Sequence, residues 1–214
     1  MYITFIAPPA AGKGTFSKKV SAKYGIPHIS TGDLLRNSDD KNIKQKLNNG
    51  EFITDEIITN LLFKRLNEED AKKGYVLDGF PRNLQQAKTY DTYLENQGKK
   101  QIVFVIDLPK EKAAKRIIGR KICPNCGAVY NDMFDNLKPK QKDICDKCQN
   151  HLIHRDDDNE KTFEKRYQTY LKETYPLVKY YEKKSLAHHI KSLDDASETW
   201  REIENIIGGL NGIN

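Results

Sequence analysis

The sequence predicts an α/β fold with a doubly wound parallel sheet. Short apolar runs typical of buried strands alternate with amphipathic stretches typical of helices along most of the chain. The first such run leads through a loop of small residues, 7–15, directly into a helix. At 214 residues the chain has the length of one α/β domain with small insertions, and it can bury a core of its own.

The loop after the first strand has the composition of a phosphate-binding loop. Gly-Lys-Gly-Thr at 12–15 stands before the expected helix 16–24, where backbone N–H groups and the helix dipole favour a phosphate. Lys13 adds a charge that can follow a migrating phosphoryl group. The loop departs from G-x-x-x-x-G-K-[ST], because Ala7 replaces the first glycine and no Ser or Thr directly follows the lysine. If Ala10 needs a positive φ, it is strained by roughly 1–2 kcal/mol. The alternative is a βα turn with incidental glycines.

The later elements continue the alternation of strands and helices. Strands are expected at 26–29, 75–77, 102–106 and 189–193, and helices at 57–66, 84–96, 110–120, 160–184 and 197–207. A helix start is also expected at Ser30 or Thr31. Segment 37–49 is polar, so its helices should be short and exposed, outside the main core. Pro176 should kink or interrupt the long helix.

Charged residues follow the expected strands at the edge of the sheet where ligands bind in this fold class. They are the Lys13 loop after the first strand, Thr31, Asp33 and Arg36 after the second, and Asp78 and Arg82 after the third. Asp78 is suited to organise Mg²⁺ through its water shell, while the two arginines suit phosphate oxygens. The alternative is that Asp78 only caps a turn before Gly79.

A second cluster of arginines flanks segment 121–154. It consists of Arg116, Arg120, Arg155 and Arg166. We expect Arg116 and Arg120 on one helix face, where like charges repel unless an anion lies between or across them. The four side chains could therefore close over a transferring phosphoryl group, although exposed arginines are also common on solvated helices.

Segment 121–154 also carries two C-x-x-C pairs and almost no apolar periodicity. The four cysteines are Cys123, Cys126, Cys145 and Cys148, with eighteen residues between the pairs. This spacing matches a tetrahedral four-thiolate zinc site, which has no open position for substrate, so the metal would be structural. Two disulfides or four reduced thiols are the alternatives. The segment is expected to be a metal-stapled insertion.

Composition restricts the function classes. The net charge of +6 is spread through the chain, and a site for several phosphates accounts for it as well as nucleic acid does. No apolar run approaches the ~20 residues that span a bilayer, and no secretory signal is visible. We therefore expect a cytoplasmic protein that does not bind membranes.

Five motifs together resemble the adenylate kinase family. They are Gly-Lys-Gly-Thr at 12–15, Ser-Thr-Gly-Asp-Leu-Leu-Arg at 30–36, Asp-Gly-Phe-Pro-Arg at 78–82, Gly-Arg at 119–120 and Arg-Asp-Asp-Asp at 155–158. The likeness runs from residue 1 to about 207, and the cysteines resemble the zinc-bearing lid of the long bacterial form. The resemblance implies a nucleoside monophosphate kinase fold. Its parts are a core (1–29, 54–120 and 158–214), a monophosphate-binding domain (30–53) and a zinc-binding lid (121–157).

The resemblance also implies a reaction and a set of site residues. A monomer would convert Mg·ATP and AMP to two ADP by direct in-line transfer, with lid closure excluding water. For ATP it implies Ala10, Ala11, Gly12, Lys13, Gly14, Thr15, Arg116 and Arg120. For AMP it implies Thr31, Arg36, Glu51, Ile53, Gly79, Arg82, Gln86, Arg155 and Arg166, with Gln86 reading the adenine edge. Catalysis would use Lys13, Asp78, Arg82, Arg120, Arg155 and Arg166, and the cofactors would be Mg²⁺ with ATP and structural Zn²⁺ on the four cysteines.

Some positions depart from the family pattern. Ala7 and Ala10 replace glycines, Asn131 replaces a frequent histidine, and Asp195 replaces a frequent glycine. A UMP/CMP kinase is one alternative, because the motif at 78–83 suits that class too, although Gln86 and the long lid weigh against it. A zinc-ribbon nucleic-acid binder is another, but it leaves the phosphate loop without a purpose.

Overall fold

The computed structural model describes residues 1–48, 53–155, 158–193 and 195–211. The chain divides into two compact units. The first, here called the sheet unit, comprises Met1–Ile6, Gly12–Ile106 and Lys172–Ile190. The second, here called the insertion unit, comprises Ala7–Ala11, Asp107–Leu171 and Lys191–Asn214.

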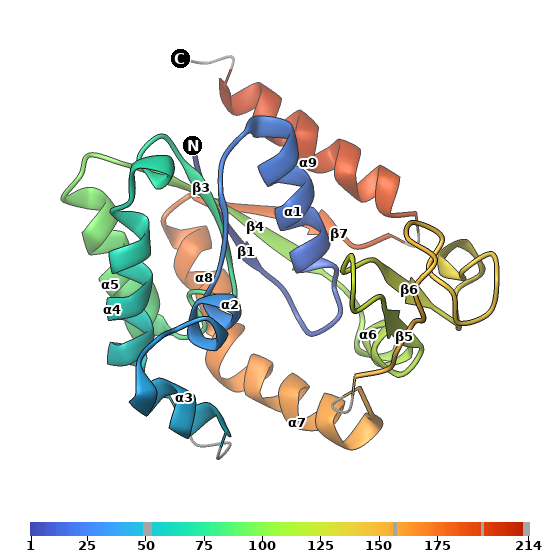
Figure 1. Cartoon of the computed structure of the whole chain (residues 1–214). Helices are drawn as coiled ribbons and strands as arrows, with labels where there is room; N and C mark the ends of the chain where they lie inside the picture. The colour runs from blue at the N-terminus through green and yellow to red at the C-terminus, as the bar shows by residue number, and fades with distance from the viewer. Residues whose placement is uncertain (49–52, 156–157, 194, 212–214) are drawn as a thin grey trace. The chain divides into compact units, whose positions relative to one another are not determined.

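Within the described residues, a five-stranded sheet has the order β2-β3-β1-β4-β7 (Figure 1). The strands are β1 Tyr2–Ile6, β2 His28–Ser30, β3 Tyr75–Asp78, β4 Gln101–Asp107 and β7 Ala187–Lys191. Strand β1 pairs in parallel with both β3 and β4, and β2 pairs in parallel with β3. The chain thus builds outward from β1 in both directions, so the predicted doubly wound parallel sheet is confirmed.

The helices of the sheet unit follow the expected alternation. They are α1 Lys13–Tyr24, α2 Thr31–Arg36, α3 Lys41–Asn48, α4 Asp55–Leu66, η1 Glu69–Ala71, α5 Leu84–Glu95 and α8 Pro176–Lys183. Helix α1 packs against β1 and β3. The Ser30 hydroxyl accepts from the Asp33 N–H at the helix start expected there, and the Thr54 hydroxyl caps α4 by accepting from the Ile57 N–H.

The sheet is buried on both faces. Ile6 and Val103 pack with Leu177 of α8 in one apolar cluster. Phe5 and Phe104, one position along each strand, point to the other face. They are also buried, and their rings stack with centroids 5.3 Å apart. A sheet covered on both faces explains the uninterrupted apolar runs of its strands.

A second cluster holds α4 and α5 against β2 and β3. Leu62 and Leu66, four residues apart on one face of α4, are buried with Tyr75 and Leu77 of β3. Tyr90 of α5 joins them, and its hydroxyl donates to the Tyr75 hydroxyl at 3.1 Å. Each of these side chains contributes roughly 1.5–3 kcal/mol by burial. The cluster holds α4 and α5 in place, and the first residues of both helices belong to the candidate site.

The insertion unit contains short strands and helices. They are α6 Lys110–Ile118, β5 Arg120–Ile122, β6 Val129–Asn131, η2 Asp135–Leu137, α7 Glu160–Thr169 and α9 Ala196–Asn211. Strands β5 and β6 pair antiparallel.

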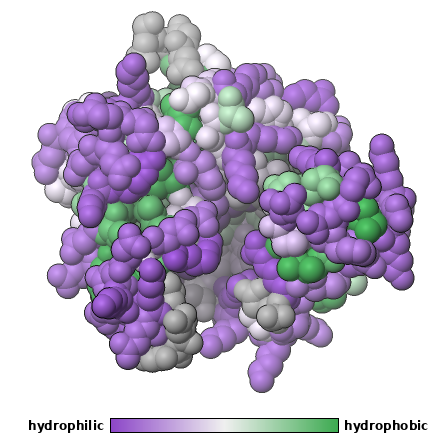
Figure 2. All heavy atoms as spheres, in the orientation of Figure 1, coloured by the Kyte–Doolittle hydropathy of each residue, from purple (hydrophilic) through white to green (hydrophobic). Residues whose placement is uncertain are grey.

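Hydrophilic side chains dominate the face shown in Figure 2, in keeping with 31% charged residues.

The helix expected at 110–120 ends at Ile118, so the placement of Arg116 and Arg120 on one helix face is wrong. Arg120 instead begins β5. The Asn131 side chain donates to the Arg116 carbonyl, which a longer helix would have used, and its oxygen lies 2.3 Å from where a Cβ on Gly119 would stand. Only glycine fits at 119, and there the chain turns from the helix into the hairpin.

Other boundaries also differ from expectation. The helix expected at 160–184 is interrupted: α7 gives way to a π-helical turn, η3 Tyr170–Thr174, and Pro176 is the first residue of α8. The predicted interruption at Pro176 is confirmed, because proline suits a helix start. The last strand begins two residues earlier than expected, at Ala187. No helix in the described part of the chain is long and apolar enough to cross a bilayer.

Candidate active site

The phosphate loop leaves the start of α1 open. The helix begins at Lys13 rather than at 16, because Gly12 adopts a left-handed conformation with φ 87° and no side chain caps the first turn. The N–H groups of that turn lack intrahelical partners and suit an anion. Ala10 has φ 62°, so the predicted strain is present. A Cβ on Gly14 would lie 3.2 Å from an Asp78 carboxylate oxygen, so a larger residue at 14 would displace the Asp78 side chain slightly.

Lys13, Asp78 and His28 form a chain of contacts at the ends of neighbouring strands. The Lys13 Nζ lies 3.3 Å from Asp78 Oδ1, and the His28 Nε2 lies 3.3 Å from Asp78 Oδ2. Burial alone would raise the pKa of Asp78, but the contacts from His28 and Lys13 outweigh it and lower this pKa to about 2. Burial lowers the pKa of Lys13 in spite of the attraction of Asp78. The site therefore holds an ionised carboxylate beside the phosphate loop.

Three of the residues predicted to bind AMP meet after β3. Gly79 has φ 86°, and its carbonyl accepts from the Thr31 hydroxyl at 3.1 Å and from the Arg82 Nε at 2.9 Å. Arg36 lies on α2, where its guanidinium donates to Asp33 at 2.6 Å. The structure thus brings the predicted β2 and β3 loops together.

Gln86 is almost completely buried, with 3% of its surface exposed. Its carbonyl oxygen accepts from the Arg82 backbone N–H at 2.7 Å, and its amide nitrogen donates to Asp55 Oδ1 at 2.7 Å. The second Asp55 oxygen accepts from the Asn83 side chain at 2.7 Å. Sequence reasoning missed this role of Asp55, because an acidic residue in a first helical turn is explained by the helix dipole alone.

Two further residues, Glu51 and Ile53, were predicted to bind AMP. Ile53 is buried, with 7% of its surface exposed. Glu51 lies outside the described residues, as does part of segment 30–53.

The insertion unit holds the other predicted arginines. The Arg116 guanidinium donates to Ser192 Oγ at 2.6 Å and to the Leu193 carbonyl at 2.9 Å, and it lies over the Phe134 ring at 5.9 Å. Arg120 donates to both oxygens of Asp158. Arg155 is exposed at the end of the insertion, and Arg166 lies half-buried on α7.

The four cysteines come together as predicted. All four sulfur atoms lie within 4.8 Å of one another, and the thiols are not joined by disulfides. The two C-x-x-C turns have the same geometry: the N–H of Gly127 donates to the Cys123 carbonyl, and the N–H of Gln149 donates to the Cys145 carbonyl. Both donors have positive φ, of 68° and 60°. Within the described residues, this is the one cluster of three or more side chains able to hold a metal ion.

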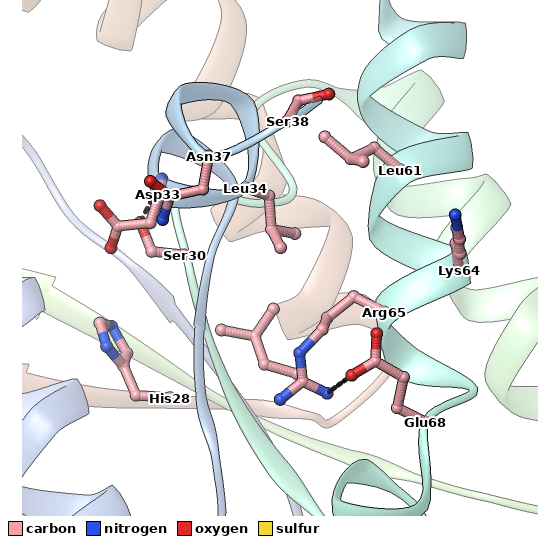
Figure 3. A pocket seen from close by; sticks show the side chains of 11 residues that line it. His28, Ser30, Asp33, Leu34, Asn37, Ser38, Leu61, Lys64, Arg65 and Glu68 are labelled. Carbon is pink, nitrogen blue, oxygen red and sulfur yellow. Dashed lines mark hydrogen bonds and ion pairs between the residues drawn. The ribbon is translucent and has the colours of Figure 1, made fainter. Parts of the chain in front are cut away.

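A separate pocket of about 280 Å³ opens between α2 and α4. Figure 3 shows Leu34 of α2 on one side of it and Leu61 and Arg65 of α4 on the other, while the Asp33 carboxylate points away from α4. Its other lining residues are His28, Ile29, Ser30, Asn37, Ser38, Lys64 and Glu68. The predicted AMP residues Thr31, Arg36, Arg82 and Gln86 are not among them, so this pocket was not foreseen from the sequence.

The parallel sheet, the lysine-bearing loop at the start of α1 and the ionised Asp78 at the next strand end are typical of P-loop nucleotide-binding proteins. Comparison with known proteins narrows this class. Residues 5–186 match the sequence profile of the family described as "Adenylate kinase". The chain belongs to the adenylate kinase family.

Curated relatives agree along nearly the full length. An adenylate kinase of Thermotoga neapolitana is 40% identical over 97% of both chains. One of Archaeoglobus fulgidus is 42% identical over 97% of this chain and 98% of its own. One of Clostridium kluyveri is 41% identical over 98% of this chain and 99% of its own. These matches favour the adenylate kinase interpretation over the UMP/CMP kinase and nucleic-acid-binding alternatives.

Proposed function

We propose that the chain transfers a phosphoryl group reversibly from Mg·ATP to AMP, giving two ADP, by direct in-line displacement. The observation that carries this proposal is the contact between Lys13, at the open start of α1, and Asp78, at the end of the neighbouring strand. The uncapped N–H groups and the mobile lysine charge suit a polyphosphate, and the ionised carboxylate beside them suits its metal ion.

On the ATP side, the loop N–H groups of residues 10–15 and the Lys13 ammonium hold the phosphates. When Mg²⁺ is bound it neutralises phosphate charge, and Asp78 is placed to accept hydrogen bonds from its water ligands. Arg116 contacts the adenine of ATP. Arg120 contacts the phosphates, and no general base is required because the charge is balanced electrostatically.

On the AMP side, Thr31, Arg36, Gly79 and Arg82 bind the monophosphate with Arg155 and Arg166, and Glu51 and Ile53 complete the site. Gln86 reads the base. After its contacts to Arg82 and Asp55, its amide keeps one N–H and one oxygen lone pair. That pair matches adenine, which presents an acceptor at N1 and a donor at N6.

The cysteines hold a structural Zn²⁺ in the lid 121–157, which with the monophosphate-binding domain 30–53 completes the three-part organisation. Four sulfurs at about 2.3 Å from one tetrahedral ion lie roughly 3.8 Å apart. The Cys123–Cys148 and Cys126–Cys145 sulfur distances of 3.3 and 3.5 Å are close to that spacing. Four thiolates leave no coordination position for substrate, so the metal holds the lid's fold.

We also propose a location, an oligomeric state and a set of partners for the enzyme. It acts as a cytoplasmic monomer on ATP, AMP and ADP, without a nucleic-acid or membrane partner.

Steady-state assays with AMP, CMP and UMP as acceptors test the proposal. AMP should be strongly preferred, and Gln86→Ala should raise KM for AMP while KM for ATP changes little. If CMP or UMP is used as well as AMP, the assignment of the acceptor is wrong.

A further inference from the structure

The contacts of the Gln86 amide define a single orientation. Its oxygen faces a donor, the Arg82 backbone N–H, and its nitrogen faces an acceptor, the Asp55 carboxylate, both at 2.7 Å. Rotating the amide by half a turn would set N–H against N–H at Arg82 and oxygen against carboxylate at Asp55. Both contacts would become repulsive inside a buried cluster.

Asp55 itself is held in place by its other oxygen and by the helix that carries it. Its Oδ2 accepts from the Asn83 side chain, and Asn83 caps α5 by accepting from the Gln86 backbone N–H at 2.9 Å. Asp55 is the first residue of α4, whose apolar face is fixed in the core by Leu62 and Leu66. The carboxylate thus links the starts of α4 and α5 across 31 residues of sequence.

We propose that Asp55 is a positioning residue for base selection, which makes the acceptor site specific for 6-aminopurine over 6-oxopurine nucleotides. The inference rests on the proposed reading of adenine by Gln86. In its fixed orientation the amide offers an N–H to an acceptor at N1 and an oxygen to a donor at position 6. Hypoxanthine reverses both groups, so IMP meets two mismatched contacts while its size and phosphate stay the same.

The isosteric variant Asp55→Asn tests this inference. Asp55 accepts from Gln86 at Oδ1 and from Asn83 at Oδ2, and asparagine has an oxygen at only one of these two positions. With its N–H₂ group at the position that faces Gln86, the variant favours the rotated Gln86 amide. We expect the ratio of kcat/KM for AMP to that for IMP to fall about tenfold or more, with KM for ATP unchanged. A merely structural role would not move this ratio.

Thr54→Ala is the matched control. Thr54 caps the same turn of α4 through the Ile57 N–H, and among the described residues the hydrogen-bond partners of the Gln86 amide are Arg82 and Asp55, not Thr54. It should loosen α4 while leaving the AMP-to-IMP ratio as in the parent. If Thr54→Ala lowers the ratio as much as Asp55→Asn does, the effect comes from the helix and the inference is overturned.

Gln86→Ala, alone and combined with Asp55→Asn, distinguishes the role of Asp55 from that of Gln86. We expect the double variant to show the same ratio as Gln86→Ala alone, because Asp55 acts through Gln86. A ratio that falls in Gln86→Ala but not in Asp55→Asn overturns the role of Asp55 and leaves the adenine site standing. A ratio unchanged in Gln86→Ala overturns the proposed adenine site, and the inference with it.

Discussion

The guanidinium of Arg120 and the carboxylate of Asp158 form a bidentate ion pair at 2.5 and 2.7 Å, and the Asp158 side chain is completely buried. Removing one partner of such a pair leaves the other charge uncompensated, which lowers the free energy of unfolding by about 3 kcal/mol. Asp158→Asn should therefore lower thermal stability. If Arg120 binds ATP phosphates, Mg·ATP supplies the missing negative charge and should raise the melting temperature of the variant more than that of the parent. Equal shifts in thermal unfolding would contradict this expectation.

Lys13→Met removes the charge at the start of α1 while keeping most of the side-chain length. We expect kcat to fall by ~10³ or more, because the ammonium stabilises charge that develops in the transition state. Lys18→Met, an exposed substitution on the same helix, is the control and should leave kcat unchanged. A loss confined to KM would show that Lys13 acts only in ground-state binding.

Ala10→Gly should relieve the backbone strain at φ 62°. The gain of roughly 1–2 kcal/mol is partly offset by the ~0.5–1 kcal/mol of extra chain entropy that glycine brings to the unfolded state. We expect a free energy of unfolding equal to that of the parent or up to ~1.5 kcal/mol higher, with turnover equal or higher. Urea unfolding and steady-state kinetics measure both. Ala11→Gly, at a residue without positive φ, should destabilise instead.

Asp78 should give the protein a pH-dependent stability in acid. Its pKa is lowered to about 2 from the ordinary value of 3.8, so its ionised form stabilises the fold above about pH 4 and this stabilisation is lost as the pH falls toward 2. The contribution is about 2 kcal/mol. Urea unfolding of the parent and of Asp78→Asn, without nucleotide or Mg²⁺, should give stability differences that shrink as the pH falls from about 4 toward 2. Differences that stay constant down to pH 2 would refute the prediction.

Metal removal should melt the lid before the sheet. In the part of segment 121–154 that packs as a core, Cys123 and Cys145 are buried with Tyr130 and Leu152, so the thiols are at its centre. Cys145→Ala, or a chelator, should lower the temperature of a first unfolding transition and reduce activity, while the separately packed sheet stays folded. Metal content, circular dichroism and activity measured together test this. Metal-free protein with an unchanged melting curve would exclude structural zinc.

Local signals predicted most of the elements and part of the site. The cap at Ser30 and the break at Pro176 depend on residues close in sequence, so their patterns could be interpreted directly. The loop of small residues also predicted a helix after it, although that helix begins at Lys13 rather than at 16. The cysteine cluster could also be predicted from the sequence, because the spacing within each C-x-x-C pair is a local property.

Contacts between distant residues could not be predicted in this way. The end of α6 depends on the Asn131 side chain, which reaches back to the Arg116 carbonyl and turns the chain at Gly119. The same holds for the partners of Arg120 and Gln86, which lie 38 and 31 residues away. No periodicity or propensity in the sequence specifies such pairs.

The sequence by itself determined the order of the strands and helices of the five-stranded sheet, the loop of small residues before the first helix and the spacing of the four cysteines, because hydrophobic period, backbone preference and ligand spacing are carried by neighbouring residues. Only the tertiary structure decided which polar groups face one another. The orientation of the Gln86 amide and the ionisation of Asp78 depend on partners from other segments, which come into contact only when the packed core excludes water.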